Sequence, residues 1–332
     1  MRFLIIGLGS MGKRRIRNLK SLGQVDIAGY DPREDRRTEA SEKFGILSFP
    51  DFNQALQCFK PDVFIISTPP DLHMHYAYLG LENEISCFIE ASVMDAEKIR
   101  DLGKLNRKSK TVIVPSCTMR YFHGPKKVKE LLRLGTIGKV LNVNYQTGQY
   151  LPDWHPWEDI EDFYVSKREM GGAREIVPFE LTWLNDIFGA ATPISCFKSK
   201  LTSLDVDIDD IYHFMLRYDD NVIANITIEV ISQPVAVREL RILGSKGQLT
   251  FSGEKNTVRI ITSGMLSWEE IQLDTGTCAR NSINPEEPYI AEMTDFIAAV
   301  ESKDADLFPN SLESDYEVLQ ILNSLEKLSE VK

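Results

Sequence analysis

The alternation of short apolar runs with helical patterns in the first 120 residues constrains the fold more than any other feature. The segments between the runs repeat apolar residues at spacings of three and four, which predicts helices. Unbroken apolar runs are typical of strands that a parallel sheet buries on both faces. Together they predict βαβ crossovers and a doubly wound sheet. The runs are "RFLIIG" (2–7), "VDIAGYD" (25–31), "VFIIST" (63–68), "SCFIEA" (86–91) and "TVIVPS" (111–116).

After about residue 120 the pattern changes. In "NVIANITIEV" (221–230) apolar and polar residues alternate, which predicts a half-buried antiparallel strand. "VRELRILGSKGQLTF" (237–251) predicts a hairpin around its GSKG turn, and helical patterns return near the C-terminus. The chain of 332 residues is long for one core, since single cores stop growing at roughly 250 to 300 residues.

We therefore predict an α/β protein of two domains. Residues 1–119 form an N-terminal Rossmann domain with a doubly wound parallel sheet, which binds a dinucleotide. Residues 120–332 form an α+β domain with a mostly antiparallel sheet for substrate binding and oligomerisation, and its last helices could pack back on the first domain.

Composition narrows the range of partners. The net charge is −11, and the basic run "KRRIR" (13–17) is too short to offset it, so we expect no nucleic acid partner. No window approaches the roughly 18 apolar residues of a membrane span. The five cysteines lack CxxC spacing, which favours thiols of a reducing compartment over disulfides or a metal site. We expect a cytoplasmic protein with no metal and no membrane contact.

Gly7, Gly9 and Gly12 form a GxGxxG pattern directly after the first predicted strand and at the start of a helix. In that context the glycines permit a tight turn, close approach of the backbone to a pyrophosphate, and close helix–strand packing. The free amides at the helix start, around Ser10 and Met11, then meet the phosphates at the positive end of the helix dipole. The alternative is a purely structural glycine turn.

Asp31 stands where a ribose-binding carboxylate is expected, about 20 residues further on and at the end of the second predicted strand. Its charge would repel a 2′-phosphate, so we expect NAD to be preferred. Arg33, Arg36 and Arg37 follow closely and could accept that phosphate, which keeps NADP possible.

Three further stretches carry a family resemblance: "DVFIISTPPDLHMHYAYLGLENEISCFIEAS" (62–92), "CTMRYFHGPKKVKELLRLGTIGKV" (117–140) and "MGGAREIVPFELTWLNDIFG" (170–189). Their order along nearly the whole chain resembles the Gfo/Idh/MocA family of oxidoreductases. The resemblance implies NAD(P) in the first domain and a sugar, inositol or nucleotide-sugar in the second. It also implies that the cofactor is lined by Ser67, Thr68, Pro69, His73, Glu90 and Ala91. For His73 the alternative is a polar residue in the first turn of a helix.

Two departures from the family concern proton transfer. The family usually has Glu-Lys-Pro where this chain has Glu90, Ala91 and Ser92, so the customary lysine is absent. On the later helix the family places an Asp, a His and another Asp where this chain has Glu175, Phe179 and Thr182. Alanine and phenylalanine supply no group that titrates near neutrality.

The loop before that helix, "GQYLPDWHPWEDIEDFYVSKREMGG" (148–172), concentrates aromatic and charged residues. Flat apolar rings can cover the face of a sugar while polar groups take its hydroxyls. Glu175 and Glu180 are each either a substrate ligand, a buried acid with a raised pKa, or an exposed acid at a helix start. Arg120 could bind a phosphate or carboxylate through its planar fork. The substrate-binding residues we expect are Arg120, Tyr150, Trp154, Trp157 and Glu175.

Four residues are candidates to replace the missing proton-handling groups. His155 is the first choice, because an imidazole titrates near neutral pH. Tyr164 with Lys167 is the second, because a nearby ammonium favours the phenolate. Glu180 is adjacent to the lost histidine position and is expected to face the cleft. For each of them the alternative is an ordinary surface residue.

These observations predict an NAD(P)-dependent oxidoreductase acting on a hydroxyl or keto carbon of a sugar or nucleotide-sugar, with a non-standard proton relay. Family members of surface-polysaccharide and nucleotide-sugar pathways have a similar loop. The alternative is a cofactor- or metabolite-sensing protein of the same fold that has lost the reaction. Because sheet-to-sheet association is common in proteins resembling this one, we expect a homodimer or homotetramer.

Overall fold

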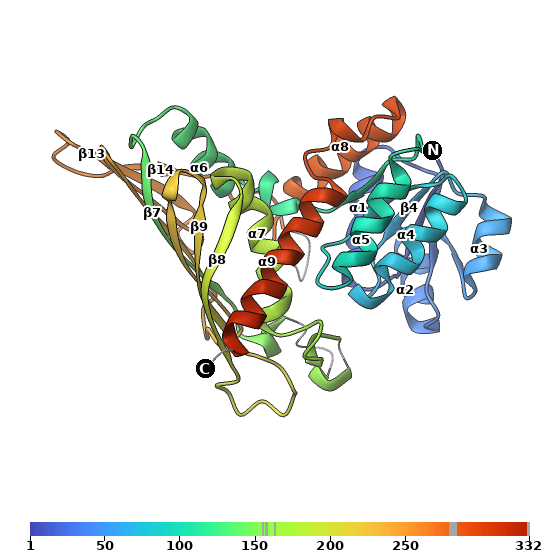
Figure 1. Cartoon of the computed structure of the whole chain (residues 1–332). Coiled ribbons are helices and arrows are strands. Elements are labelled where there is room, and N and C mark those ends of the chain that lie inside the picture. The colour runs from blue at the N-terminus through green and yellow to red at the C-terminus, as the bar shows by residue number, and fades with distance from the viewer. Residues whose placement is uncertain (155, 157–158, 163, 279–283, 331–332) are drawn as a thin grey trace. The chain divides into compact units, whose positions relative to one another are not determined.

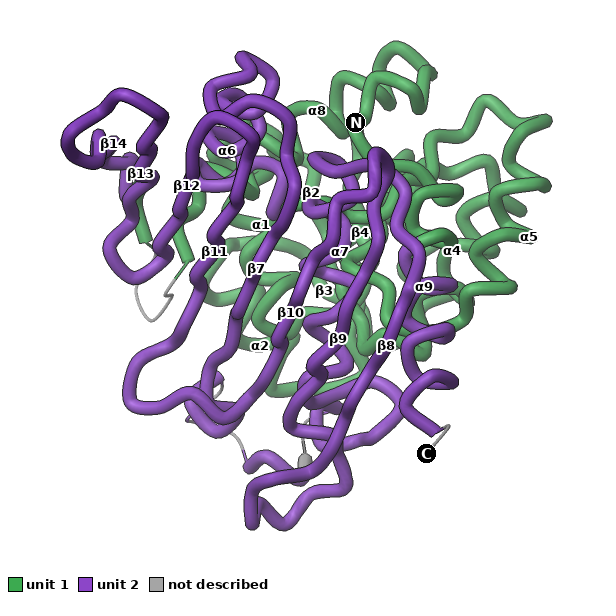
Figure 2. Tube along the Cα trace, turned by 60° about the vertical axis from the view of Figure 1, so that its left-hand side comes forward, with its two compact units in different colours: residues 1–118, 276–317 green, residues 119–275, 318–332 purple. Residues whose placement is uncertain are grey.

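The computed structural model describes residues 1–154, 156, 159–162, 164–278 and 284–330 and divides the chain into two compact units (Figure 2). Unit 1 comprises residues 1–118 and 276–317, and unit 2 comprises residues 119–275 and 318–332. The chain passes from unit 1 to unit 2 after residue 118, one residue before the predicted boundary at 119, and it returns to unit 1 at residue 276. None of the described helices is long and apolar enough to cross a membrane.

Unit 1 contains a six-stranded, wholly parallel sheet in the order β3-β2-β1-β4-β5-β6, which confirms the predicted doubly wound fold. The order reverses between β1 and β4, and ligands of such sheets bind outside the carboxyl ends of the strands at this point. β1, β4 and β5 are buried along their whole length. The strands are β1 (Phe3–Ile6), β2 (Ile27–Tyr30), β3 (Leu47–Phe49), β4 (Val63–Ile66), β5 (Ser86–Ile89) and β6 (Ile113–Pro115).

Helices on the two faces of this sheet complete unit 1 (Figure 1). α2 and β3 were not predicted, because the segment is polar and β3 is a short, partly exposed edge strand with no apolar run. The helices are α1 (Ser10–Ser21), α2 (Glu34–Phe44), α3 (Phe52–Phe59), α4 (His73–Glu82), α5 (Ala96–Asn106), α8 (Glu287–Ser302) and the first part of α9 (Leu312–Glu330).

Unit 2 contains an eight-stranded sheet in the order β14-β13-β12-β11-β7-β10-β9-β8. β11 and β12 form the predicted hairpin. β10 pairs antiparallel with β9 but parallel with β7, so the expectation of an antiparallel strand holds on one side only. The strands are β7 (Val140–Gly148), β8 (Ala191–Ser199), β9 (Ile211–Tyr218), β10 (Ile223–Glu229), β11 (Val237–Gly244), β12 (Gly247–Ser252), β13 (Thr257–Thr262) and β14 (Glu269–Gln272).

The two faces of the second sheet differ in character. α6 (His123–Arg133), α7 (Ala173–Phe188) and the later part of α9 lie on one side of it (Figure 1). The apolar residues of β9 and β10, such as Phe214 and Ile226, are fully buried on that side. The opposite face is largely polar: one row of paired residues that crosses the sheet consists of Phe197, His213, Thr227, Gln146 and Glu239. Helices of the same unit therefore cover the apolar face.

Candidate cofactor and substrate sites

The glycine loop of unit 1 has the shape that a bound pyrophosphate needs. Gly7 has φ +92°, and a Cβ there would lie 2.5 Å from the carbonyl oxygen of Ser67. A Cβ on Gly12 would lie 1.9 Å from the carbonyl oxygen of Gly7, so α1 packs against the loop as closely as the pattern predicts. Gly9 caps α1 with no side-chain hydrogen bond, which leaves the first-turn amides, including those of Ser10 and Met11, without a side-chain cap.

Asp31 is bound to this loop directly. It follows β2 and is buried, and its Oδ2 accepts a hydrogen bond from the amide of Leu8 at 2.8 Å. Oδ1 accepts from the amide of Arg33 at 2.9 Å. Since a carboxylate oxygen has more than one acceptor position, these two bonds orient the group and leave it able to accept ribose hydroxyls.

Of the three arginines after Asp31, Arg36 lies nearest the glycine loop. Its guanidinium is 3.5 Å from the position of a Cβ on Gly9 and 3.8 Å from Asp31 Oδ2. Arg33 pairs with Asp35 at 2.6 Å on the exposed surface, and its predicted role in cofactor binding stays a prediction. Arg37 donates to the backbone carbonyls of residues 31 and 32. Spacing alone could not rank three arginines within five residues.

The carboxyl end of β4 presents Ser67, Thr68 and Pro69, all half-buried. His73 is buried in the first turn of α4, and its Nε2 lies 2.9 Å from the carbonyl oxygen of Thr68. Burial lowers the pKa of His73, so the neutral ring donates from Nε2 and keeps an acceptor at Nδ1. Within the described residues, neither His73 Nδ1 nor the buried Thr68 Oγ1 has a hydrogen-bond partner. Two such atoms fit a site that binds a polar group.

Glu90 and Ala91 follow β5, the next strand of the sheet, and both are half-buried. Glu90 accepts two hydrogen bonds from Arg15, from Nε at 2.6 Å and from Nη2 at 2.9 Å. Ser67 Oγ lies 3.4 Å from the same carboxylate. Arg15 was not predicted as a site residue, because it reads as one member of a basic run on α1.

In unit 2, two glycines bring Tyr164 beside the start of α7. The amide of Gly172 donates to the carbonyl of Val165 at 3.0 Å, and a Cβ on Gly171 would lie 1.9 Å from that same oxygen. This close packing joins the 3-10 turn Tyr164–Ser166 to the helix. The Tyr164 hydroxyl donates to Glu175 Oε1, in the first turn of α7.

Glu175 is a largely desolvated carboxyl with a raised pKa. The residue is half-buried, but its Oε2 is inaccessible and has no hydrogen-bond partner within the described residues. Burial raises the pKa of Glu175 to about 7, although the bond from Tyr164 opposes the shift. A carboxyl with a pKa near the working pH can both take up and release a proton.

Glu180, in contrast, is fully buried and has three donor groups around its carboxylate. Its Oε2 accepts from Tyr145 Oη and Trp183 Nε1, each at 2.6 Å, and Arg238 Nη2 lies 2.8 Å from Oε1. The carboxylate thus joins α7 to β7 and β11 inside unit 2. This geometry supports a role in holding Arg238 and Tyr145, and the catalytic role stays a prediction.

The remaining predicted residues of unit 2 lie on several elements. Arg120 donates from Nε to the carbonyl of Thr182 at 3.1 Å. Tyr150 and Trp154 are half-buried after β7, where Trp154 Nε1 donates to the carbonyl of Gln149 at 3.3 Å. Lys167 has an exposed side chain. His155 and Trp157 lie outside the described residues, so their predicted roles stay predictions.

A Rossmann unit with an uncapped glycine loop and a ribose-site carboxylate defines a class, the NAD-binding oxidoreductases. Comparisons with known proteins agree with it. Residues 1–116 match the family described as "Oxidoreductase family, NAD-binding Rossmann fold", and residues 126–250 match "GFO/IDH/MocA C-terminal domain". The chain belongs to the Gfo/Idh/MocA family, and unit 1 is its NAD-binding domain.

Similar proteins include dehydrogenases. A myo-inositol 2-dehydrogenase of Thermotoga maritima is 25% identical over 142 residues, and the match spans 42% of each chain. An oxidoreductase from Agrobacterium radiobacter, solved with NAD+, L-tartaric acid and magnesium, has a TM-score of 0.86 at 12% identity, covering 100% of this chain and 96% of the other. A levoglucosan dehydrogenase complexed with NADH has a TM-score of 0.83 at 17% identity, covering 99% and 97%. At such identities these structures establish the fold alone.

Proposed function

We propose that the protein is an NAD(P)-dependent oxidoreductase that acts on a hydroxyl or keto carbon of a sugar or nucleotide-sugar. The observation that carries this proposal is the Tyr164–Glu175 pair, which supplies a titrating group in unit 2 although the family's lysine and histidine are replaced by Ala91 and Phe179. The similarity to inositol and levoglucosan dehydrogenases supports a polyhydroxylated substrate.

The proposed reaction needs a hydride acceptor and a group that takes up a proton. A nicotinamide held by unit 1 would supply the acceptor for the hydride of the carbinol carbon. The hydroxyl proton must leave at the same time, and the ionised carboxylate of Glu175 is the group that takes it. Tyr164 holds Glu175 through its hydroxyl, and in the reverse reaction Glu175 returns the proton to the carbonyl oxygen. Alcohol and NAD+ thus give ketone, NADH and one proton.

Other residues of unit 2 bind the substrate in this proposal. Tyr150 and Trp154 present rings after β7, and Trp157 belongs to the same loop. Arg120 already donates to a backbone carbonyl, so it can contribute only its remaining donors to a phosphate or carboxylate. Two alternative bases remain. One is His155, and the other is Tyr164, whose phenolate a nearby Lys167 would favour. A reducing compartment such as the cytoplasm fits five cysteines without CxxC spacing.

The decisive experiment follows nicotinamide absorbance while the full chain meets a panel of sugars, inositols and nucleotide-sugars with NAD+ or NADP+. We expect turnover that falls about 100-fold or more in Glu175→Gln, because general acid–base catalysis typically contributes 10² to 10⁴. Cofactor affinity should stay within twofold. His155→Ala is the matched comparison: a loss there with unchanged turnover in Glu175→Gln would transfer the role of base to His155.

A second function, a cofactor- or metabolite-sensing protein, is favoured by the absence of both customary proton-handling residues. It predicts stoichiometric cofactor binding, with no turnover on any member of the panel. The absorbance assay, together with a measurement of cofactor binding, therefore separates the two functions. The enzyme proposal fails if the chain binds the cofactor tightly but no substrate of the panel changes the nicotinamide absorbance.

A further inference from the structure

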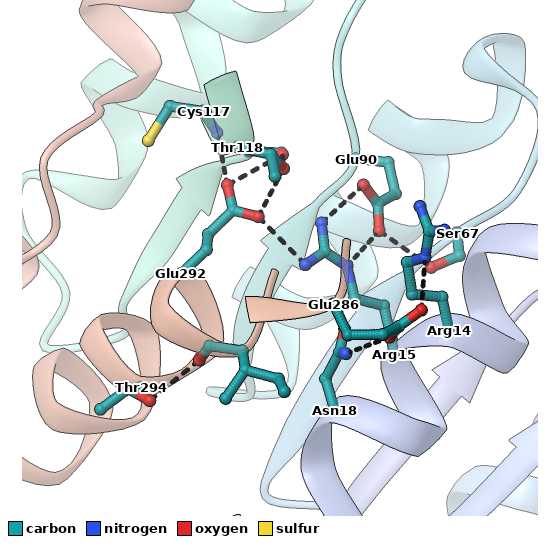
Figure 3. Close-up of polar contacts among 12 residues, drawn as sticks. Arg14, Arg15, Asn18, Ser67, Glu90, Cys117, Thr118, Glu286, Glu292 and Thr294 are labelled. Atoms are coloured by element: carbon teal, nitrogen blue, oxygen red, sulfur yellow. Dashed lines mark hydrogen bonds and ion pairs between the residues drawn. The ribbon is translucent and has the colours of Figure 1, made fainter. Parts of the chain in front are cut away.

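A buried charge cluster connects α1, β5 and α8 within unit 1 (Figure 3). We define the Arg15 triad as Arg15, Glu90 and Glu292. Arg15 is fully buried, and its Nη1 lies 3.0 Å from Glu292 Oε2 while Nε and Nη2 bind the two oxygens of Glu90. The guanidinium also lies over the ring of Phe88, 4.5 Å from its centroid. The Arg15 guanidinium is therefore enclosed by side chains of unit 1.

Glu292 fixes the far side of the triad. Its fully buried carboxylate accepts from Ser116 Oγ at 3.0 Å and from the amide of Cys117 and the hydroxyl of Thr118, both at 2.6 Å. These are the last three residues of unit 1 before the chain enters unit 2. These three hydrogen bonds fix the orientation of the Glu292 carboxylate, and the carboxylate in turn sets the position of the Arg15 guanidinium.

Stability does not account for this arrangement. Burying an arginine and two carboxylates costs desolvation energy, and well-packed apolar residues of similar volume are often as stable or more so. Two members of the triad have no exposed side-chain surface, whereas Glu90 keeps 13% exposure at the end of β5. The cluster thus holds one carboxylate, that of Glu90, in one orientation at the edge of the sheet where ligands bind.

The topology of unit 1 identifies which part of the cofactor lies near that edge. The glycine loop after β1 takes the pyrophosphate, and Asp31 after β2 takes the ribose of the adenosine. The other half of the dinucleotide must then extend in the opposite direction, past β4 towards β5. Ser67 follows β4 and Glu90 follows β5, and the two side chains are 3.4 Å apart. Glu90 therefore stands at the nicotinamide end.

We propose that Arg15 and Glu292 are positioning residues that hold the Glu90 carboxylate at the nicotinamide end of the cofactor site, where its charge favours binding of the oxidised cofactor over the reduced one. The oxidised nicotinamide ring carries a positive charge and the reduced ring carries none. A fixed carboxylate in a site of low dielectric attracts only the former. With the family's lysine replaced by Ala91, no ammonium at that position opposes this attraction.

The test measures cofactor binding alone, so its outcome is independent of the proposed sugar reaction. Dissociation constants of NAD+ and NADH are determined for the full chain by calorimetry at fixed ionic strength. We expect Glu90→Gln to shift the ratio of the two constants about 3- to 10-fold towards NADH. Arg15→Lys should shift it the same way, because a single ammonium cannot bind both oxygens of Glu90 and also Glu292.

The combination of variants distinguishes positioning from a merely structural role. In the Glu90→Gln background, Arg15→Lys should have no further effect on the ratio, because Arg15 acts through Glu90. Arg14→Lys is the matched control on the same helix, since Arg14 Nε pairs with Glu286 at 3.2 Å, and it should leave the ratio unchanged.

Two results would overturn the proposal: an unchanged ratio in Glu90→Gln, or an Arg15→Lys effect that persists in the Glu90→Gln background. If Arg15→Lys does not fold, Glu292→Gln decides. The loss of its negative charge leaves Arg15 to offset Glu90 more fully, so we expect a smaller shift towards NADH, and an unchanged ratio contradicts the proposal.

Discussion

At the residue scale, three glutamates with buried carboxylate oxygens occupy different environments. Glu180 is surrounded by the donor groups of Tyr145, Trp183 and Arg238. Glu292 accepts three hydrogen bonds from residues 116–118 and forms an ion pair with Arg15. Glu175 has one donor, Tyr164, and one oxygen without a partner among the described residues. Only an incompletely paired buried carboxylate is poised to exchange a proton.

The environment of Glu175 predicts the pH dependence of the reaction. The carboxyl must be ionised to take the hydroxyl proton, so kcat/KM for oxidation should rise as pH increases through about 7 and then level off. Because the bond from Tyr164 lowers the pKa of Glu175, Tyr164→Phe should move this midpoint to higher pH. Initial rates between pH 5 and 9 check both; a midpoint unmoved in Tyr164→Phe contradicts the pairing.

The same group affects stability in a defined direction. Its folded pKa of about 7 lies above the ordinary value of 4.5, so stability is fully present below pH 4.5 and is lost as pH rises through 7. The difference corresponds to at most about 3 kcal/mol. Urea unfolding should therefore show Glu175→Gln gaining stability relative to the unsubstituted chain at pH 8 compared with pH 5. If the variant and the unsubstituted chain differ in stability by the same amount at pH 5 and pH 8, the raised pKa of Glu175 is contradicted.

At the element scale, the start of α1 depends on backbone contacts that no side chain can replace. Gly12 permits α1 to lie against Gly7, and this contact sets the amides of the first turn. The C-terminal α9 begins differently, with a side-chain cap. The Ser311 hydroxyl accepts from the amide of Ser314 at 3.1 Å, while Asn310 donates to the carbonyl of Pro115 at 3.2 Å.

Gly12→Ala should abolish measurable NAD+ binding at micromolar concentrations, because its Cβ would lie 1.9 Å from a backbone oxygen and the loop must move. Gly23→Ala, after the same helix, is the control. Gly23 has φ +76° with nothing within 4 Å of a Cβ, so it should cost only about 1 kcal/mol and leave affinity unchanged. Calorimetry with urea unfolding measures both, and NAD+ binding by Gly12→Ala within twofold of the unsubstituted chain would refute this account of the loop.

At the scale of the whole molecule, the open face of the eight-stranded sheet is the surface available for association. Helices of unit 2 cover the apolar face, and the opposite face combines polar side chains such as Asn225 with the exposed Phe197. We propose that a second copy binds this face, giving the homodimer or homotetramer expected from the family resemblance.

Light scattering after gel filtration should therefore give at least twice the mass of one chain. Thr227→Arg, near the middle of the open face, should shift the mass towards one chain, because it places unpaired charges opposite each other at a symmetric interface. Lys255→Arg, on an exposed turn after β12, is the control and should not change the mass. A single-chain mass for the unsubstituted protein contradicts the proposal directly.

The sequence alone determined the doubly wound sheet, the glycine loop with Asp31, the hairpin of β11 and β12, and the family. Local periodicity and short residue spacings predict these features, because the physical constraints on them act within a few tens of residues. The parallel pairing of β7 with β10, the burial of Glu180 and the choice of Arg36 among three arginines could not be read in this way, because each depends on which distant elements pack together.

The tertiary structure alone decided the two carboxylate environments on which both proposals rest. Glu175 titrates near neutrality because the turn at Tyr164 and the first turn of α7 remove it from water together. Arg15 belongs to the basic run of residues 13–17 but is not a surface charge, because α8, from the other end of the chain, supplies Glu292 to it. Burial and charge pairing are properties of assembled elements, so a sequence pattern cannot specify them.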